Sequence, residues 1–205
     1  PVKGCRGVAL EEAPLEPRGL AHDRRWMIVT PDGRFRTQRE LPLLATIEAV
    51  VGDGGLTLRR GAQELAGAPA GVGGPKAGPG LAGRVEALRP DAAVDTALAG
   101  WLGQPVCLVR FPERVRRRCD PDHAGLEAHT AFADGFPVLV TSDASLREVN
   151  EALLERGVEP VPMDRFRPNV VLSGLPPRAE DAHRQVELAG GAALRLVGRC
   201  GRCGV

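Results

Sequence analysis

Short alternating segments closed by turn residues most constrain what the first half of this sequence can fold into. The segment 23–30 is typical of a strand, and the turn Pro31-Asp32-Gly33 returns it through residues 34–37 as a hairpin. A second alternating segment at 45–51 turns through Gly52–Gly55 and resumes at 56–59. These two predicted hairpins indicate that β-sheet dominates this half.

The length and the charge balance limit the class of protein. A chain of 205 residues can bury a real core, as one large β-rich domain or as two smaller ones. It has 27 Lys and Arg against 26 Asp and Glu, so the net charge is +1. Because no overall positive field would hold a polyanion, we expect no nucleic-acid partner.

Hydropathy and cysteine usage indicate where the protein works. No stretch approaches the roughly 18–20 continuous apolar residues of a membrane span, and Pro1 does not open a signal sequence. The five cysteines are an odd number without the spacing of a disulfide framework, which indicates a reducing compartment. We therefore expect a soluble, cytoplasmic protein. The start at Pro1 and the strand-like end at Val205 also suggest a fragment.

Composition and periodicity predict the elements that follow. The segment 66–83 consists almost only of Ala, Gly and Pro, so we expect a mobile linker that carries no site. Asp91 can cap a short helix with one apolar face. A strand is expected at 105–111 and a buried strand at 138–141, and Ser145 and Glu148 form a capping box that opens a second helix. The apolar face of the first helix contains Val94, Leu98, Trp101 and Leu102.

A Cys-x-x-Cys pair near the end of the chain is the best candidate for a reactive or metal-bound sulfur. Arg199 and Arg202 flank Cys200 and Cys203, and neighbouring positive charge favours the thiolate that attacks or ligates. Three interpretations of the pair stay open: a zinc site with two further ligands, a redox disulfide, or one soft thiolate ligand to a cofactor metal.

Basic residues near the N-terminus are candidates for binding an anion. The turn at 1–7 lets Lys3 and backbone N–H groups converge on one point, although an ordinary polar turn with a solvated lysine explains the same residues. Five arginines lie between positions 24 and 39, and a solvated basic face is the simpler interpretation. Arg39 can equally form an ion pair near Glu40. The arginines are Arg24, Arg25, Arg34, Arg36 and Arg39.

Polar residues also stand at the ends of predicted strands in the second half. Asp134 and Gly135 form a turn at the entrance of the strand at 138–141, where turns line pockets. Pro168 favours an extended approach to the strand at 170–172, which would point Arg167 and Asn169 to the same side. The basic cluster at 114–118 is read as a solvated charged loop.

Seven motifs, taken in their order along the chain, resemble the MOSC-domain family with its N-terminal β-barrel-type region. Within this family, the sequence resembles the amidoxime-reducing proteins and their bacterial counterparts. The resemblance covers nearly the whole sequence. The motifs are Pro1–Gly7, Asp23–Trp26, Thr37–Glu40, Phe132–Pro137, Arg165–Asn169, Glu180–Asp181 and Cys200–Cys203.

The resemblance implies a fold and a cofactor. It implies a mainly β protein, α+β by content, in which a β-barrel MOSC domain with short helices at 108–205 packs against a β-rich region at 1–107. The first ~25 residues of that region join the barrel in this interpretation. The cofactor would be Mo-molybdopterin, with Cys203 as the metal ligand and catalytic residue. The positions that match cofactor contacts are Lys3, Gly4, Arg24, Arg39, Asp134, Gly135, Arg167 and Asn169.

The chemistry of these residues agrees with the resemblance, with one departure. A dianionic phosphate is bound by Arg and Lys donors, a pterin edge by an amide and a carboxylate, and molybdenum by a thiolate. The family usually carries Ser after the lysine of the first motif, where this sequence has Gly4. A backbone N–H must then replace the hydroxyl donor.

The resemblance leads to three hypotheses for function. In the first, the protein is a molybdenum oxidoreductase that removes oxygen from a small N-hydroxylated or N-oxygenated substrate, with electrons from an external donor protein or a fused iron–sulfur domain. In the second, it is a molybdenum-cofactor or sulfur carrier without turnover of its own. In the third, Cys200 and Cys203 have a structural role with zinc or as a disulfide.

Overall fold

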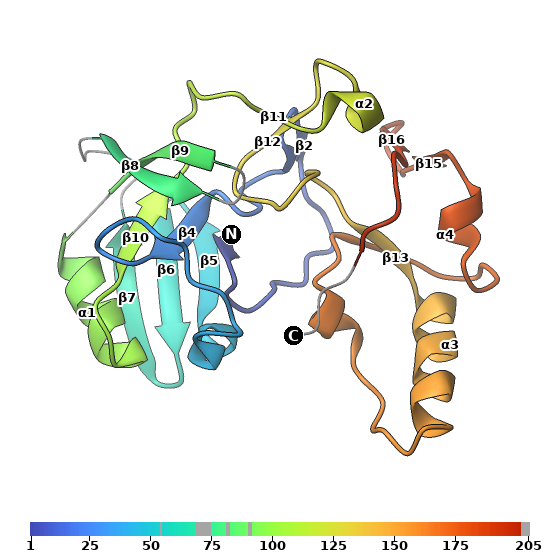
Figure 1. Cartoon of the computed structure of the whole chain (residues 1–205), viewed down its shortest axis with the longest axis horizontal. Coiled ribbons are helices and arrows are strands. Elements are labelled where there is room, and N and C mark those ends of the chain that lie inside the picture. Colours follow the sequence, from blue (N-terminus) through green and yellow to red (C-terminus); the bar gives the residue numbers. More distant parts are fainter. Residues whose placement is uncertain (54, 69–74, 81–82, 90–91, 202–205) are drawn as a thin grey trace.

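The protein divides into two lobes joined by a long irregular segment (Figure 1). The computed structural model describes residues 1–53, 55–68, 75–80, 83–89 and 92–201. The N-terminal lobe contains the larger sheets and helix α1 (Ala92–Leu102), whereas the C-terminal lobe contains α3 (Asp143–Leu154), α4 (Ala179–Ala182) and short strands. The two hydrophobic clusters gather residues of the first 132 positions, so the N-terminal lobe is the better packed.

A five-stranded sheet forms the centre of the N-terminal lobe. Its order is β1-β4-β10-β9-β8, in which β1 runs parallel to β4 and the other neighbours are antiparallel. The strand expected at 23–30 is its β4, with Trp26 opposite Arg110 and Val29 opposite Cys107. The bounds are β1 Val2–Lys3, β4 Trp26–Val29, β8 Pro75–Gly80, β9 Gly83–Leu88 and β10 Cys107–Arg110.

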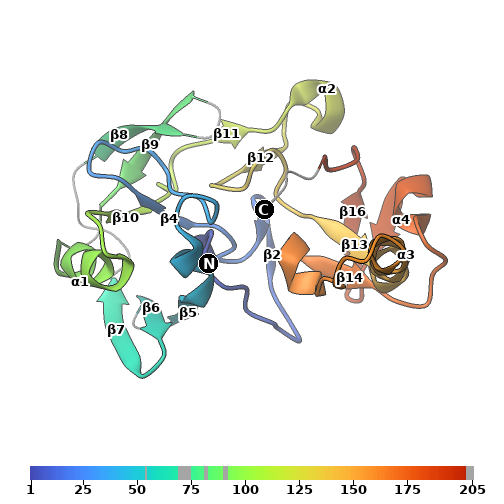
Figure 2. The same ribbon diagram turned by 60° about the horizontal axis from the view of Figure 1, so that its bottom comes forward.

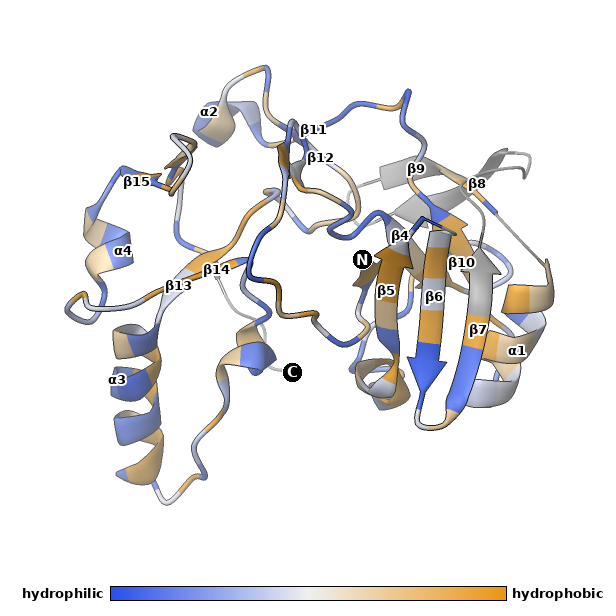
Figure 3. Ribbon diagram, turned by 180° about the vertical axis from the view of Figure 1, so that it is seen from behind, coloured by the Kyte–Doolittle hydropathy of each residue, from blue (hydrophilic) through white to orange (hydrophobic). Residues whose placement is uncertain are grey.

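A three-stranded antiparallel sheet packs beside it. The expected hairpin is confirmed, because β5 (Glu48–Gly52) pairs with β6 (Gly55–Arg60), and β7 (Gln63–Ala68) extends the sheet. The 3-10 helix η1 (Pro42–Thr46) leads into β5. Figure 3 shows apolar residues along β5 and β6 and polar residues at the lower ends of β6 and β7.

Strand β4 lies between two hydrophobic clusters because its side chains alternate. Trp26 and Ile28 join the cluster that includes residues of β5, β6 and α1, while Met27 and Val29 join the cluster on the other face of the strand. The expected apolar face of α1 is confirmed, with Trp101 only 8% exposed. Its proposed cap, Asp91, lies outside the described residues. In the second cluster Phe132 meets Phe111 edge to face, with 5.2 Å between ring centroids.

The expectation of a linker at 66–83 is wrong in part. Strand β7 reaches Ala68, and β8 and β9 form an antiparallel hairpin in which Gly80 pairs with Gly83. Backbone groups alone make such a ladder, so a segment poor in apolar side chains can still join a sheet edge.

The C-terminal lobe is built from short elements (Figure 2). Strands β13 and β14 are parallel, and β15 and β16 are antiparallel. The strand expected to be buried at 138–141 is only half-buried. The second helix is present, but its cap is Ser142 rather than Ser145, because the Ser142 hydroxyl accepts from Ser145 N. The bounds are β13 Val140–Ser142, η2 Met163–Phe166, β14 Val170–Leu172, β15 Gln185–Glu187 and β16 Ala193–Arg195.

The fold is mixed α+β, with mostly sheets and few helices. The expected barrel does not close within the part of the chain that the structure describes. Closure requires every strand to have two neighbours, whereas β1 and β8 each have one in the five-stranded sheet and the C-terminal strands pair only in twos. Among the described residues, no helix is long and apolar enough to cross a membrane.

Small elements connect the lobes. Strand β11 (Arg117–Arg118) pairs with β12 (His129–Thr130), and the single turn α2 (Pro121–Ala124) lies between them. The hairpin of β2 (Leu15–Glu16) and β3 (Gly19–Leu20) touches the segment that follows β12. At Gly19 φ is +102°, and a Cβ would lie 2.9 Å from both the Cβ and the carbonyl oxygen of Pro137. Only glycine fits this close approach.

We predict that Gly19→Ala destabilises the protein by about 1–3 kcal/mol, because the new methyl group clashes with Pro137 and the backbone is strained. Urea denaturation measures the effect. Gly190→Ala is the matched control, since Gly190 has φ +89° but nothing within 4 Å of the added Cβ. Equal losses in the two variants would show that the contact with Pro137 is unimportant.

Candidate functional site

Lys3 links the first strand to the segment that follows β12. Its Nζ donates to Phe132 O at 2.9 Å and to Asp134 Oδ1 at 2.7 Å. The parallel pairing of β1 with β4 places Lys3 there, and the burial of the Phe132 ring fixes the acceptor. The Lys3 side chain is 14% exposed and that of Asp134 is 86% exposed. The ammonium is therefore held inside while the carboxylate faces solvent.

The charges of this pair depend on opposing effects. Burial lowers the pKa of Lys3, and the positive charges of Arg24 and Arg117 add to that effect against the favourable pairing with Asp134. Desolvation acts to raise the pKa of Asp134, but the hydrogen bond from Lys3 and the charges of Lys3, Arg24 and Arg117 outweigh it. The net result is a pKa of Asp134 below its ordinary value.

Arg24 joins the two lobes directly. Its guanidinium donates to Asp23 Oδ2 at 2.5 Å, to Asn169 Oδ1 at 3.3 Å and to the Arg167 carbonyl at 3.0 Å. Arg24 has φ +47°, in the left-handed region that non-glycine residues rarely adopt. Such conformations cost about 1–3 kcal/mol and concentrate at functional sites.

Arg167 reaches back to the first turn of the chain. It follows η2, where its N–H closes a turn onto Asp164 O, and its guanidinium donates to the Cys5 carbonyl. The expected extended approach is wrong, because the closed turn holds Arg167 in the left-handed region with φ +52°. Burial, and next the charge of Arg24, lower the pKa of Arg167.

Asn169 lies directly before β14, at the strand entrance that the sequence indicated, and hydrogen bonds to Leu139 hold it there. Its N–H donates to Leu139 O at 2.9 Å, and its Oδ1 accepts from Leu139 N at 3.0 Å as well as from Arg24. With Oδ1 engaged in this way, the amide nitrogen of Asn169 is the group left to face a ligand.

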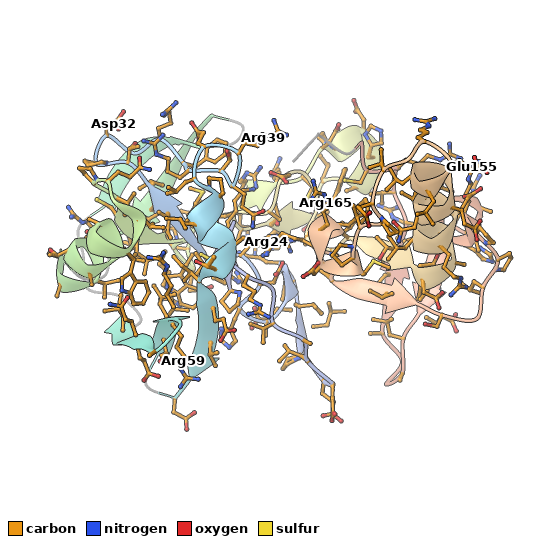
Figure 4. All side chains as sticks on the ribbon, turned by 90° about the horizontal axis from the view of Figure 1, so that it is seen from below. Arg24, Asp32, Arg39, Arg59, Glu155 and Arg165 are labelled. Atoms are coloured by element: carbon orange, nitrogen blue, oxygen red, sulfur yellow. The ribbon has the colours of Figure 1, made fainter. Side chains whose placement is uncertain are left out.

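Two glycines and Arg39 complete the predicted set. Gly4 has φ +82°, in the left-handed region that favours glycine, and its carbonyl accepts from Gln38 Nε2 at 2.7 Å. Gly135 is exposed beside Asp134. Arg39 is exposed and makes no hydrogen bond or ion pair with the described residues. In Figure 4 Arg24 lies where the lobes face each other and Arg39 lies apart from it.

The cysteine pair is described only in part. Cys200 is exposed, and its neighbour Arg199 pairs with Asp181 at 3.2 Å. Cys203 lies outside the described residues. Within the described ranges, no group of three or more His, Cys, Asp and Glu side chains is arranged to hold a metal ion. Burial raises the pKa of the Cys5 thiol to about 12, so this cysteine stays a neutral core residue.

Arg117 is a residue that the sequence analysis missed. It was read as part of a solvated loop, but it is half-buried and donates to three carbonyl groups. The acceptors are Ala131 O at 2.8 Å, Ala133 O at 2.6 Å and Asp134 O at 2.7 Å. Its only sequence signal is its place in the basic cluster at 114–118, which does not distinguish it from Arg116.

Comparison with known families decides the relationship. Residues 1–97 match the MOSC N-terminal beta barrel domain, and residues 127–205 match the MOSC domain. The chain belongs to the MOSC-domain family. The motifs that suggested this family therefore indicated it correctly.

Two groups of named proteins are similar to this MOSC protein. Mitochondrial amidoxime-reducing component 1 of Mus musculus is 32% identical over 99% of the chain, and that of Homo sapiens is 31% identical. Molybdenum cofactor sulfurase of Oryza sativa subsp. japonica is 28% identical, also over 99% of the chain. The chain spans 62% of the length of the first two relatives and 27% of that of the third.

The cation cluster has the chemistry that a phosphate group needs. Four cations, Lys3, Arg24, Arg117 and Arg167, interact with three carboxylates, Asp23, Asp134 and Asp164, which leaves an excess of positive charge. Burial opposes the charged forms of Lys3 and Arg167, and an incoming dianion offsets that cost. Arg167 also uses one guanidinium nitrogen for Cys5 within the described part of the chain, so other donors remain. The MOSC protein's residues thus fit a cofactor with a terminal phosphate.

We predict that Arg24→Ala lowers the affinity for a phosphate-bearing cofactor by about 10- to 100-fold, from loss of roughly 1.5–3 kcal/mol of charge-assisted hydrogen bonding. Molybdenum per chain, after expression in a host that makes the cofactor, measures this. Arg116→Ala is the control for charge, since Arg116 is exposed and precedes Arg117 in the sequence. Full occupancy in Arg24→Ala would exclude the role.

A second prediction concerns pH. Because the pKa of Asp134 is lowered in the folded protein, its stabilising effect is complete above the unfolded-state pKa and disappears as the pH falls through the folded-state pKa. Since the carboxylate is mostly exposed, we expect Asp134→Asn to cost no more than about 1 kcal/mol at neutral pH and nothing in strong acid. The free energies of unfolding of the unaltered protein and of Asp134→Asn, measured from neutral pH to strong acid, test this prediction. A difference that persists in strong acid would contradict it.

Proposed function

We propose that this protein binds a molybdenum cofactor and acts as an oxidoreductase that reduces N-hydroxylated or related N-oxygenated small molecules. The observation that carries the proposal is the meeting of Lys3, Arg24 and Arg167 across the two lobes. Arg167 is more than 140 positions from Lys3 and Arg24 along the chain, and Arg24 and Arg167 occupy strained backbone positions.

Each residue has a defined task in this proposal. Lys3 and Arg24 donate to the terminal phosphate. Hydrogen bonds to carbonyl and carboxylate oxygens hold both cations in fixed positions, so they are oriented before the ligand binds. The Asp134 carboxylate accepts hydrogen bonds from the polar edge of the pterin, and the amide nitrogen of Asn169 donates to it. Gly4, Gly135, Arg39 and Arg167 form the rest of the proposed contact set. Cys203 supplies the thiolate ligand.

The bound cofactor supplies a two-electron redox centre. Reduction of an N-hydroxylated substrate releases its oxygen as water and consumes two electrons and two protons. The electrons come from a separate protein or a fused iron–sulfur domain. Residues 1–107 and 108–205 are proposed as the β-rich region and the MOSC domain, with the cofactor between them and the protein in the cytoplasm.

A second candidate function is a cofactor or sulfur carrier. The observation that favours it is the match of the sulfurase from Oryza sativa subsp. japonica to 99% of this chain. A carrier needs the same phosphate contacts but no turnover. Purified protein with stoichiometric molybdenum that reduces an amidoxime with a reduced viologen supports the oxidoreductase, whereas the same metal content without reduction supports the carrier.

We predict that Cys203→Ser abolishes molybdenum-dependent reduction, while Cys200→Ser retains most of it, because one thiolate suffices for the metal. Activity and molybdenum content are measured on the same preparations. Cys119→Ser, which removes a buried cysteine outside the pair, is the control for general loss of a thiol. Equal, complete losses from both variants would favour a site that needs two sulfurs, such as zinc or a disulfide.

A further inference from the structure

Four consecutive carbonyl groups in the segment 131–134 accept hydrogen bonds from cationic side chains. Lys3 binds the second, Phe132 O, and Arg117 binds the first, third and fourth. The segment passes from the buried core at Ala131 and Phe132 to the exposed Asp134 within three residues. These bonds hold the backbone where that change occurs.

We propose that Arg117 is a positioning residue: it fixes the backbone of 131–134 so that the Asp134 carboxylate meets Lys3. The inference rests on the proposed function, because it concerns the same anion site, but Arg117 acts there through the segment rather than by touching the ligand. Both hydrogens of its Nη1 are committed to Ala131 and Ala133, and Nη2 binds Asp134 O.

The planar fork of arginine is what this task requires. Three acceptors within four residues are spanned by two guanidinium nitrogens whose directions are fixed relative to each other. A lysine ammonium keeps the charge but is a single point on a flexible stem, so it cannot span the same carbonyls. The substitution Arg117→Lys therefore separates the geometric role of Arg117 from its charge.

The position of Asp134 depends on this anchoring because other restraints on it are few. Its side chain is 86% exposed, the next residue is a glycine, and its carboxylate accepts from Lys3 Nζ at 2.7 Å. The charged groups that act on its carboxyl group are Lys3, Arg24 and Arg117. If the backbone shifts, the contact with Lys3 is lost and the carboxyl group titrates at higher pH.

The experiment follows the Asp134 carboxyl titration by NMR in the 205-residue chain, which needs no cofactor. We expect the titration midpoint to rise in Arg117→Lys, which keeps the charge, and to rise further in Arg117→Gln, which removes the charge as well as the hydrogen bonds. The exposed neighbour provides the matched control, and Arg116→Lys should leave the midpoint unchanged. A midpoint that rises in Arg117→Gln but not in Arg117→Lys would show that charge alone matters and would overturn the proposal.

A double-mutant cycle tests the route of the effect. If Arg117 acts through the Lys3–Asp134 contact, Arg117→Lys should shift the midpoint no further once Lys3→Met is present. Additive shifts would contradict this route. Should a variant fail to fold, hydrogen-bond scalar couplings from the Arg117 guanidinium to the three carbonyl carbons can be measured in the unaltered chain. Their absence would also overturn the proposal.

Molybdenum content distinguishes the failure of this inference from that of the proposed function. If Arg117→Lys raises the midpoint while the unaltered protein takes up no molybdenum, the positioning role holds and the cofactor proposal fails. If the unaltered protein takes up molybdenum and Arg117→Lys leaves the midpoint low, the cofactor proposal holds and the positioning role fails.

Discussion

Half-buried cations must find oxygen acceptors, and the site between the two lobes depends on this requirement. An ammonium or guanidinium group that leaves water loses hydration, which is costly unless hydrogen bonds replace it. Here the acceptors are mostly backbone carbonyls from distant segments, namely Phe132 O for Lys3, Arg167 O for Arg24 and Cys5 O for Arg167. The same contacts therefore join the lobes and collect positive charge at one place. Binding an anion and holding the lobes together are, in this structure, two results of one set of interactions.

Local patterns predicted the parts of the fold that local forces determine. The alternation around Trp26 and around Ala49 identified β4 and the β5–β6 hairpin, and the helical spacing of Leu98 and Trp101 identified the buried face of α1. The strand of Gly and Pro at 75–80 was missed because its pairing with β9 comes from the backbone and has no side-chain signature. The barrel expected from family resemblance does not close among the described residues, since sheet closure depends on pairing between distant strands.

In the candidate site, too, local motifs predicted some features, whereas contacts between distant segments determine others. Motifs selected Lys3, Arg24, Asp134, Arg167 and Asn169, and the structure brings these residues together. The motifs could not show that Arg167 adopts a left-handed conformation or that Arg117 differs from its neighbours, because both facts follow from carbonyl acceptors elsewhere in the chain. Conversely, Arg39 was selected by its motif and lies exposed, without a partner in the described part of the chain.

The central claim is that the cations between the lobes bind the phosphate of a molybdenum cofactor whose metal is held by Cys203. The most direct measurement is a crystal structure of the protein purified from a host that makes this cofactor, with anomalous scattering to locate the metal. The account predicts a molybdenum peak at Cys203 Sγ and a phosphate within hydrogen-bond distance of Lys3 and Arg24. A metal peak elsewhere, or a phosphate bound away from these two residues, would contradict it.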